Sequence, residues 1–414
     1  MSINKKQVII GNSAAGLNAV KSIRKRDRSC PITLISAEKC NAYSPVLLTY
    51  YISNKIPREN LFIVDENFYR NYNVTTIFGQ RAIEIDRSKQ VVYLENGNNV
   101  QYDNLLIATG ASAKKIGDYS DDIFSKIVKL RTIEDANKIK RLSNESKEIV
   151  VVGAGLVSLQ IINAIYKEKV KITVLVGSKQ ILSKNIDAEC ADIIQEKIQS
   201  NSMISFEFKR NIEKIERKKD KLWITLNTGE ALKADMLVAG KGVSPNIELA
   251  KNGAIKTNTG ILIDDYLRTN YNNIYAAGDV SEGKNMITGK SDVVPNWINA
   301  CEQGEVAGLN MLGHQEKYKG SLNINITNMF DFTIASIGLS RPLDKNMEEI
   351  KLVDQERGIY RKFIIKDDMI LGALLVGKID DAGIIRSVVQ NSVDITNIKK
   401  LMPKRMLNTA QLFL

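Results

Sequence analysis

The hydrophobic positions of this chain form two strand-like runs that each end in glycine. The first run is Val8–Ile10, followed by Gly11, and the second is Ile149–Val152, followed by Gly153. Apolar residues at helical spacing come after the first run, and a further β-branched run then begins at Ile32. Strands that alternate with helices in this order predict parallel sheets, so we expect an α/β fold.

Each glycine turn is an imperfect dinucleotide-binding loop. Ser13 replaces the middle glycine of the first turn, and Ser158 replaces the last glycine of the second. A parallel strand that enters such a turn aims the unpaired amides of the next helix at a pyrophosphate. Glu38 follows 27 residues after Gly11, where a carboxylate can bind a ribose diol. One imperfect motif on its own leaves an alternative open, namely an ordinary strand-turn-helix connection that binds no nucleotide.

Four further motifs resemble a flavoprotein family. They are Tyr102–Gly110, Leu130–Ala136, Gly242–Asn246 and Asn273–Val280, in this order. Together with the glycine turns they are similar to the pyridine nucleotide-disulfide oxidoreductase superfamily over nearly the whole chain. The resemblance implies two Rossmann-like domains, one for FAD and one for NAD(P), and a smaller C-terminal α/β domain.

The resemblance also implies the residues that hold the two cofactors. Asp279 would accept a hydrogen bond from the ribityl chain of FAD, and Trp297 would lie against the flavin edge. The residues expected to bind FAD are Gly11, Ser13, Ala14, Gly16, Glu38, Pro45, Ala82, Ala108, Thr109, Gly110, Arg131, Gly278, Asp279 and Trp297. The residues expected to bind NAD(P) are Gly153, Gly155, Leu156, Val157, Gln160 and Gly242.

The segment Ala42–Ile52 contains no cysteine. By the resemblance, disulfide and peroxide reductases carry a redox thiol here beside the flavin, and Val46 stands in that position. Electrons are therefore expected to leave the flavin directly. In this respect the chain resembles one branch of the family, which contains NADH:rubredoxin reductases, oxygenase-type ferredoxin reductases and the flavin portion of assimilatory nitrite reductases. Thr49 replaces the lysine that oxygenase-type ferredoxin reductases carry near the flavin. The resemblance therefore gives no expectation for the reduction potential of the flavin in this chain.

The nicotinamide half departs from the family pattern at two positions. Gln160 stands where many members carry a glutamate near the nicotinamide, and Val176 stands where a glutamate often binds the adenine ribose. Without that carboxylate a 2′-phosphate is not repelled, and Ser178 and Lys179 follow directly. No arginine pair stands at this strand end, so we expect a small preference for NADH over NADPH. A site that binds nucleotides weakly or not at all is the alternative.

The order of the motifs predicts the domain boundaries. We expect an FAD-binding domain at 1–112 and 242–320, an NAD(P)-binding domain at 113–241, and a C-terminal domain at 321–414. The turn Asn227–Glu230 predicts a β-hairpin inside the NAD(P)-binding domain, and two strands are expected around the turn Asp367-Asp368 of the last domain. By analogy with the family, the last domain implies a possible homodimer.

Composition excludes several other classes. No apolar run reaches membrane-spanning length, and the N-terminus lacks a long apolar segment, so we expect a cytoplasmic protein without a membrane span. Cys30, Cys40, Cys190 and Cys301 lie far apart, and His314 is the single histidine, so we expect no disulfide framework and no metal site. Cys40 precedes Val46 by six residues and is interpreted as an incidental thiol.

The chain is basic, with 58 Lys and Arg against 47 Asp and Glu and a net charge of +11. The excess includes the patches Lys21–Arg28 and Arg217–Lys219. We expect an acidic iron-sulfur carrier as the partner, because opposite fields raise encounter rates. Nucleic acid is excluded by the lack of any recognition motif.

These observations predict an FAD-dependent NAD(P)H oxidoreductase that reduces a rubredoxin or ferredoxin. No side chain is expected to act as an acid or base, because the flavin carries the chemistry. Two alternatives remain: a flavin subunit of a larger iron-sulfur or molybdenum/tungsten complex, and an NADH oxidase.

Overall fold

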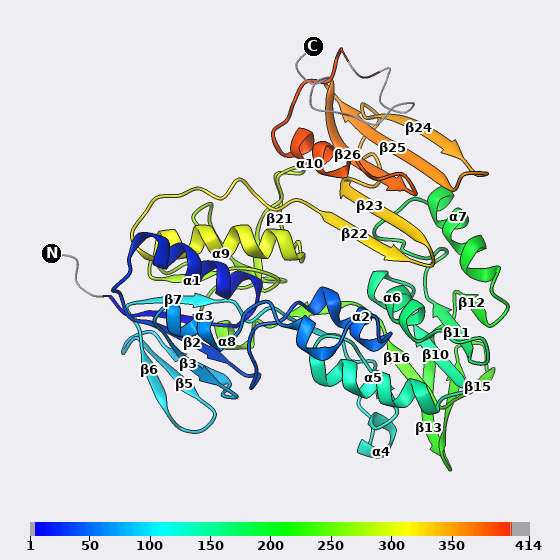
Figure 1. The fold of residues 1–414 in the computed structure, drawn as a ribbon, viewed down its shortest axis with the longest axis horizontal. Coiled ribbons are helices and arrows are strands. Elements are labelled where there is room, and N and C mark those ends of the chain that lie inside the picture. Colours follow the sequence, from blue (N-terminus) through cyan, green and yellow to red (C-terminus); the bar gives the residue numbers. More distant parts are fainter. Residues whose placement is uncertain (1–4, 398, 400–414) are drawn as a thin grey trace. The chain divides into compact units, whose positions relative to one another are not determined.

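The structure is a computed structural model that describes residues 5–397 and residue 399 (Figure 1). The chain divides into two units, each assembled from three separate segments. The first unit contains the residues up to Ser44, Arg58–Ser112 and Val243–Asn323. The second contains Pro45–Pro57, Ala113–Gly242 and the chain from Ile324 onward.

A five-stranded parallel sheet forms the centre of the first unit. Its order is β19-β7-β1-β2-β3, and the strands are β1 (Gln7–Ile10), β2 (Ile32–Ser36), β3 (Val74–Phe78), β7 (Asn104–Ile107) and β19 (Ile274–Ala276). Ile9 lies opposite both Leu34 and Leu106, and all three side chains are buried. β-branched and leucine side chains fill both faces of such a sheet, which explains its nearly continuous hydrophobic strands.

Two long helices lie side by side in this unit, α1 (Ala14–Arg26) and α9 (Trp297–Met311), as Figure 1 shows. Glycines allow their close approach. A Cβ at Gly304 would lie 2.2 Å from the carbonyl oxygen of Ala15, and one at Gly308 would lie 2.1 Å from the hydroxyl of Ser22. Two glycines one turn apart on α9 therefore fix how it packs against α1.

Smaller elements complete the first unit. They are the antiparallel strands β4 (Ala82–Asp86), β5 (Val91–Leu94) and β6 (Asn99–Gln101), the helices α3 (Glu66–Asn71) and α8 (Glu248–Asn252), and the strands β18 (Ile261–Leu262), β20 (Ser281–Lys284) and β21 (Ser291–Asp292). Strands β8 (Ala111–Ala113) and β17 (Val243–Pro245) pair where the chain leaves and re-enters this unit.

The second unit repeats the parallel architecture. Its sheet has the order β12-β11-β10-β16-β9, with β9 (Ile127–Val128), β10 (Glu148–Val152), β11 (Lys171–Val176), β12 (Ile204–Phe208) and β16 (Met236–Ala239). The helices that accompany this sheet in the second unit are α2 (Leu48–Ile52), α4 (Asp121–Phe124), α5 (Ile133–Glu145), α6 (Leu156–Ile165) and α7 (Ala188–Gln199). The antiparallel strands β13 (Ile212–Lys218), β14 (Lys221–Leu226) and β15 (Ala231–Ala234) include the expected hairpin at Asn227–Glu230.

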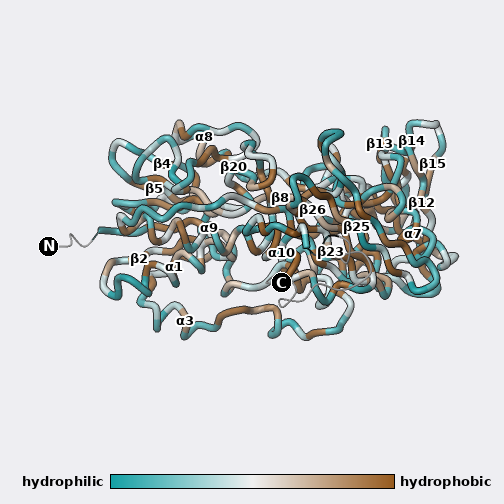
Figure 2. The backbone as a smooth tube through the Cα atoms, turned by 90° about the horizontal axis from the view of Figure 1, so that it is seen from above, coloured by the Kyte–Doolittle hydropathy of each residue, from teal (hydrophilic) through white to brown (hydrophobic). Residues whose placement is uncertain are grey.

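An antiparallel sheet of five strands follows in the same unit. Its order is β22-β23-β26-β25-β24, with β22 (Ile324–Met329), β23 (Phe332–Gly338), β24 (Glu348–Asp354), β25 (Ile359–Lys366) and β26 (Met369–Val376), and α10 (Ala382–Gln390) packs on it. Figure 2 shows the hydrophobic character of β25 and β26, the strands predicted around the turn Asp367-Asp368. The expected fold class is confirmed: two parallel dinucleotide-type sheets and a C-terminal α/β domain.

Charged side chains tie this antiparallel sheet to the start of α7, next to the parallel sheet of the same unit. The ammonium group of Lys362, almost fully buried, lies 2.5 Å from the carboxylate of Asp187 and 3.0 Å from that of Glu349. The hydroxyl of Tyr360 donates to the same Asp187 at 2.7 Å. Within the described residues, no helix has the length and hydropathy needed to span a bilayer.

Candidate functional site

The first glycine turn lies between β1 and α1 and leaves no room for side chains. Gly11 has a φ of +127°, and a Cβ there would lie 2.1 Å from the carbonyl oxygen of Ala108. A Cβ at Gly16 would lie 1.9 Å from the carbonyl oxygen of Gly11. Ser13 is the N-cap of α1, but its hydroxyl makes no capping hydrogen bond, and Ala14 is the first helical residue. The amides of this helix start therefore keep no side-chain partner at the cap.

A tyrosine holds the expected ribose-binding carboxylate in place. The hydroxyl of Tyr43 donates to Glu38 at 2.8 Å, just beyond β2. A second tyrosine, Tyr69, donates to the side chain of Asn12 within the glycine turn and accepts from the amide of Ala42. Burial raises the pKa of Tyr69, which keeps this hydroxyl protonated and able to donate. Sequence reasoning did not single out these partners, because no motif marks them.

The motifs that resemble flavin-binding segments lie at neighbouring strand ends. Thr109 follows β7, and its hydroxyl donates to the carbonyl oxygen of Asn246, whose side-chain amide donates back to the carbonyl oxygen of Thr109. The side chain of Gln303 accepts from the amide of Gly278 at 2.7 Å and so fixes the turn that carries Asp279. Asn246 is the last residue of the motif Gly242–Asn246, so the sequence signal for it was available, whereas Gln303 lies outside the four motifs.

The remaining residues expected to bind FAD are distributed over both units. Trp297 begins α9, Ala82 begins β4, Ala108 follows β7, and Gly110 has a φ of +65°. Pro45 and Arg131 belong to the second unit, Pro45 just before α2 and Arg131 just before α5.

Helix starts distinguish the two expected nucleotide sites from the rest of the described structure. Among the described helices of ten residues or more, α5, α7 and α9 are capped by the side chains of Thr132, Asp187 and Asn296. The starts of α1 and α6 have neither a side-chain cap nor an acidic residue in the first turn. Such a start leaves N–H groups and a positive dipole end for an anion, so these residues fit the pyrophosphates of FAD and NAD(P).

The second glycine turn packs against another glycine, Gly240, at the end of β16. Gly153 has a φ of +90°, and a Cβ there would lie 2.4 Å from the carbonyl oxygen of Gly240. Ser158 is fully buried, and Gly240 makes room for it: a Cβ at Gly240 would lie 1.8 Å from the Ser158 hydroxyl. Gly155 and Gly242 both have open space where a Cβ would stand. Leu156 begins α6, and Val157 exposes 46% of its surface.

Gln160 lies one turn further along α6 and reaches the C-terminal sheet. Its side-chain nitrogen donates to the hydroxyl of Thr327 on β22 at 2.5 Å. Val176 is buried at the end of β11, so it offers no carboxylate at this strand end.

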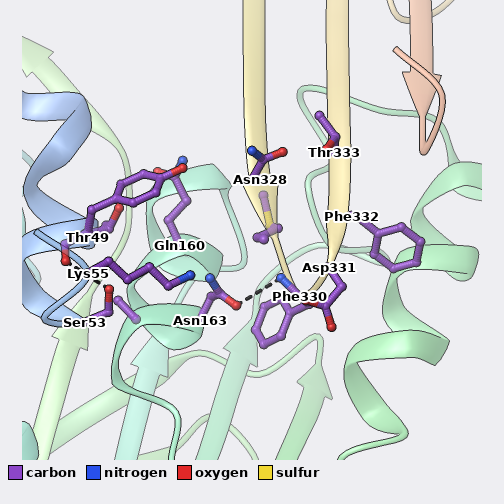
Figure 3. A pocket seen from close by; sticks show the side chains of 13 residues that line it. Thr49, Ser53, Lys55, Gln160, Asn163, Asn328, Phe330, Asp331, Phe332 and Thr333 are labelled. Atoms are coloured by element: carbon purple, nitrogen blue, oxygen red, sulfur yellow. Dashed lines mark hydrogen bonds between the residues drawn. The ribbon is translucent and has the colours of Figure 1, made fainter. Parts of the chain in front are cut away.

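A cavity of about 200 Å³ lies beside Gln160, entirely within the second unit (Figure 3). Segments of α2, α6 and the β22–β23 hairpin enclose it. The lining residues are Thr49, Tyr50, Ser53, Lys55, Gln160, Asn163, Ala164, Asn328, Met329, Phe330, Asp331, Phe332 and Thr333.

Three of the four cysteines are buried or half-buried thiols with a raised pKa, and none stands at position 46. Val46 exposes 55% of its surface in the turn before α2. Burial raises the pKa of Cys30, Cys190 and Cys301, so these side chains stay protonated. No cluster of three or more metal-binding side chains occurs in the part of the chain that the structure describes.

One expectation about the basic patch on α1 is wrong. Arg24 is buried, and its guanidinium donates to the carbonyl oxygens of Tyr72 and Asn73. Its charge therefore serves to join α1 to the end of α3. Lys21 and Lys25 are exposed, as expected for a surface patch.

Two family descriptions match the chain. The first, "Pyridine nucleotide-disulphide oxidoreductase", covers residues 5–304, and "Rubredoxin NAD+ reductase C-terminal domain" covers 324–393. The chain therefore belongs to the pyridine nucleotide-disulphide oxidoreductase family, and it is an FAD-dependent NAD(P)H oxidoreductase.

Individual proteins agree with this assignment. The chain is 30% identical over 399 residues to the NADH-dependent phenylglyoxylate dehydrogenase subunit epsilon of Aromatoleum evansii, covering 95% of this chain and 93% of the relative. It is 26% identical over 308 residues to the rubredoxin-NAD(+) reductase of Pseudomonas putida, covering 74% and 80%. The crystal structure of a covalent putidaredoxin reductase-putidaredoxin complex contains a chain of the same fold, with a TM-score of 0.89, 21% identity, and coverage of 99% of this chain and 98% of that one.

Proposed function

We propose that the chain passes electrons from NAD(P)H through FAD to a small iron-sulfur carrier such as rubredoxin or ferredoxin. The observation that carries this proposal is Val46, an exposed aliphatic side chain at the position where the resemblance places a redox thiol. Without that thiol, this chain has no cysteine at this position that could exchange with the disulfide of a substrate. The matched rubredoxin reductase C-terminal domain and the similarity to a rubredoxin-NAD(+) reductase support the same acceptor class.

In this proposal the cofactor-binding residues hold FAD and the nicotinamide nucleotide by electrostatic attraction and by shape, and take no part in the chemistry. The amides at the starts of α1 and α6 bind the two pyrophosphates, with Glu38 on the FAD ribose and Asp279 on the ribityl chain. Flavin supplies the chemistry that accepts a hydride and releases single electrons. Pro45 and Trp297 shield it, and Gly155 and Gly242 leave space for the nicotinamide nucleotide.

We also propose the domain limits and the cellular setting. The FAD-binding domain comprises 1–112 and 242–320, the NAD(P)-binding domain 113–241, and the C-terminal domain 321–414, whose last residues lie outside the described part of the chain. The protein acts in the cytoplasm, forms a homodimer, and its carrier is acidic. The net charge of +11 supports the last point, because an acidic carrier would be attracted to it.

The nucleotide preference is a separate proposal. We infer a small preference for NADH, because there is no arginine pair next to Val176 to bind a 2′-phosphate. Anaerobic mixing with NADH should bleach the flavin absorption faster than mixing with NADPH at equal concentration. A large advantage of NADPH would reject the preference and implicate Lys179.

A stopped-flow experiment tests the acceptor. NADH-reduced protein should reduce rubredoxin or ferredoxin much faster than a disulfide, and the rate should fall with added salt once screening shortens the Debye length below roughly 8 Å. Replacing Lys21 and Lys25 by glutamate tests whether the exposed part of the α1 patch is the docking face, with ferricyanide reduction as the control. Absent or salt-insensitive carrier reduction, together with rapid turnover of oxygen or disulfide, would contradict the proposal.

A second candidate is a flavin subunit in a larger redox complex. The similarity to a dehydrogenase subunit over nearly the full length of both chains favours it. Gel filtration of the protein purified from its native host separates the two candidates, because a stable complex elutes with further subunits whereas a free reductase does not.

A further inference from the structure

The cavity beside Gln160 has two hydrogen-bond donors that face each other. The side chain of Asn163 accepts from the backbone amide of Phe330 at 3.0 Å, and this bond fixes which way its amide group is turned. The amide nitrogen of Asn163 therefore faces the cavity. Figure 3 shows the ammonium end of Lys55 pointing toward it. Two donors cannot bond to each other, so an acceptor placed between them would satisfy both.

Lys55 is exposed to solvent and has no ion-pair partner among the described residues. Its recorded contact is a cation–π approach, 5.9 Å from the centre of the Tyr50 ring. Asp331 is the one carboxylate among the lining residues, and its side chain points away from Lys55 in Figure 3. The hydroxyl of Thr49 lines the same wall, whereas the hydroxyl of Ser53 donates to the carbonyl oxygen of Tyr50 at 3.1 Å. This end of the cavity is therefore suited to an anion.

A strained turn forms the opposite wall. Phe330 and Asp331 are the two central residues of the β22–β23 hairpin, with φ values of +49° and +64°. Such turns normally use asparagine and glycine, because other residues cost free energy at positive φ. Strained backbone of this kind gathers at ligand sites, where the surrounding structure maintains it. The bond from Phe330 to Asn163 does so here.

We propose that this cavity binds a carboxylate group, held by the ammonium of Lys55 and the amide of Asn163. The volume of about 200 Å³ matches about seven water molecules at roughly 30 Å³ each, so it admits a small organic acid or one acidic side chain. The carboxylate comes either from a free small acid or from an acidic side chain of the electron carrier. The second source rests on the proposed function, and the first does not.

Calorimetric titration with acetate and with benzoate tests the free acid. Wild-type protein should bind one of them saturably, and the affinity should fall at least tenfold in Lys55→Met and in Asn163→Asp. The aspartate keeps the acceptor for Phe330 but replaces the donor by a negative charge. Lys169→Met, which removes an exposed lysine of the same unit, is the matched control and should bind as the wild type does. Thermal melting confirms that each variant is folded.

Carrier kinetics test the second source. With NADH as donor, kcat/KM for rubredoxin should fall at least tenfold in Lys55→Met and Asn163→Asp relative to Lys169→Met, and acetate should compete with the carrier. An effect in either experiment supports the carboxylate site and identifies its source. If both experiments leave the two variants indistinguishable from Lys169→Met, the inference is overturned. If no nucleotide reduces the flavin, the proposed function fails, and the titration alone still decides the site.

Discussion

At the second glycine turn, a buried serine packs directly against a glycine of a neighbouring strand end. Ser158 fills the position that a glycine takes in the regular motif, and Gly240 provides the missing space at the end of β16. The two positions are far apart in sequence, so the motif alone shows a missing glycine and not the residue that compensates for it. The packing shows that the turn keeps its close strand-to-helix approach by a compensating pair.

Gly240→Ala should therefore lower the free energy of unfolding by about 1–3 kcal/mol, because the added methyl overlaps the Ser158 hydroxyl. Ser158→Gly in the same chain should restore part of the loss. Restoration stays partial because the methyl also lies 2.9 Å from the carbonyl oxygen of Val152. Urea unfolding of the wild type, the single variants and the double variant measures the coupling. Equal losses in the single and double variants would contradict it.

Asp279→Ala should weaken FAD binding about 10- to 100-fold, the range expected when a hydrogen bond to a charged group is lost. The flavin-to-protein absorbance ratio after gel filtration reports the occupancy. The released flavin should be FAD, because the segment from Gly11 to Glu38 would have no role with FMN. Release of FMN would refute the first cofactor site as proposed here.

At the scale of helices and strands, side-chain caps separate α5, α7 and α9 from the two helices whose starts are proposed to bind pyrophosphates. Thr132 caps α5 in a reciprocal box with Asp135, whereas Ser13 stands at the start of α1 and makes no such bond. Both are hydroxyl residues before a helix, but only Thr132 is followed three residues later by an acidic side chain, Asp135, whereas Ser13 is followed by Gly16. The start of α1 therefore lacks the side-chain cap that stabilises the start of α5.

Thr132→Ala should consequently reduce the free energy of unfolding by about 1 kcal/mol with or without FAD. Ser13→Ala should change the FAD-free protein by less than about 0.5 kcal/mol, as for an ordinary surface substitution. Chemical denaturation of the two variants, freed of flavin, compares them directly. A loss in Ser13→Ala as large as in Thr132→Ala would mean that Ser13 acts as a cap after all.

Sequence patterns predicted the elements whose signals are local. The β-branched runs before Gly11 and Gly153, the hairpin at Asn227–Glu230 and the strands around Asp367-Asp368 all occur where expected. Contacts between distant segments could not be predicted in this way. The burial of Arg24 against the end of α3 is one example, since a basic helical residue looks the same in sequence whether it meets water or carbonyl groups.

Across the molecule as a whole, buried charge joins the C-terminal sheet to α7. Burial alone would raise the pKa of Asp187, but hydrogen bonds from Lys362, Tyr360 and the amide of Cys190 lower it below its usual value. The carboxylate therefore both caps α7 and neutralises Lys362 on β25. Glu349 provides the second partner of this lysine.

Asp187→Asn should lower the free energy of unfolding at pH 7 by about 2 kcal/mol, less than for a fully isolated buried charge because Glu349 remains. A carboxyl with a lowered pKa stabilises the fold above its unfolded pKa of about 4, and this contribution is lost as the pH falls further. The difference between wild type and variant should therefore shrink from pH 7 to about pH 3. A difference that is constant over this range would exclude the titration of Asp187 as its source.

The interleaved assembly of the two units affects how the protein is made. The first unit lacks its strand β19 and helix α9 until the ribosome has passed Met311, and the second lacks β26 until Val376. At roughly 5–20 residues per second, the parallel sheet of the first unit and the antiparallel sheet of the second therefore remain incomplete until late in synthesis. Flavin capture then comes late in synthesis, after Asp279 and Trp297 have emerged. We therefore expect the yield of folded protein to rise with the supply of chaperones and free FAD during translation, and neither unit to fold when the gene is truncated.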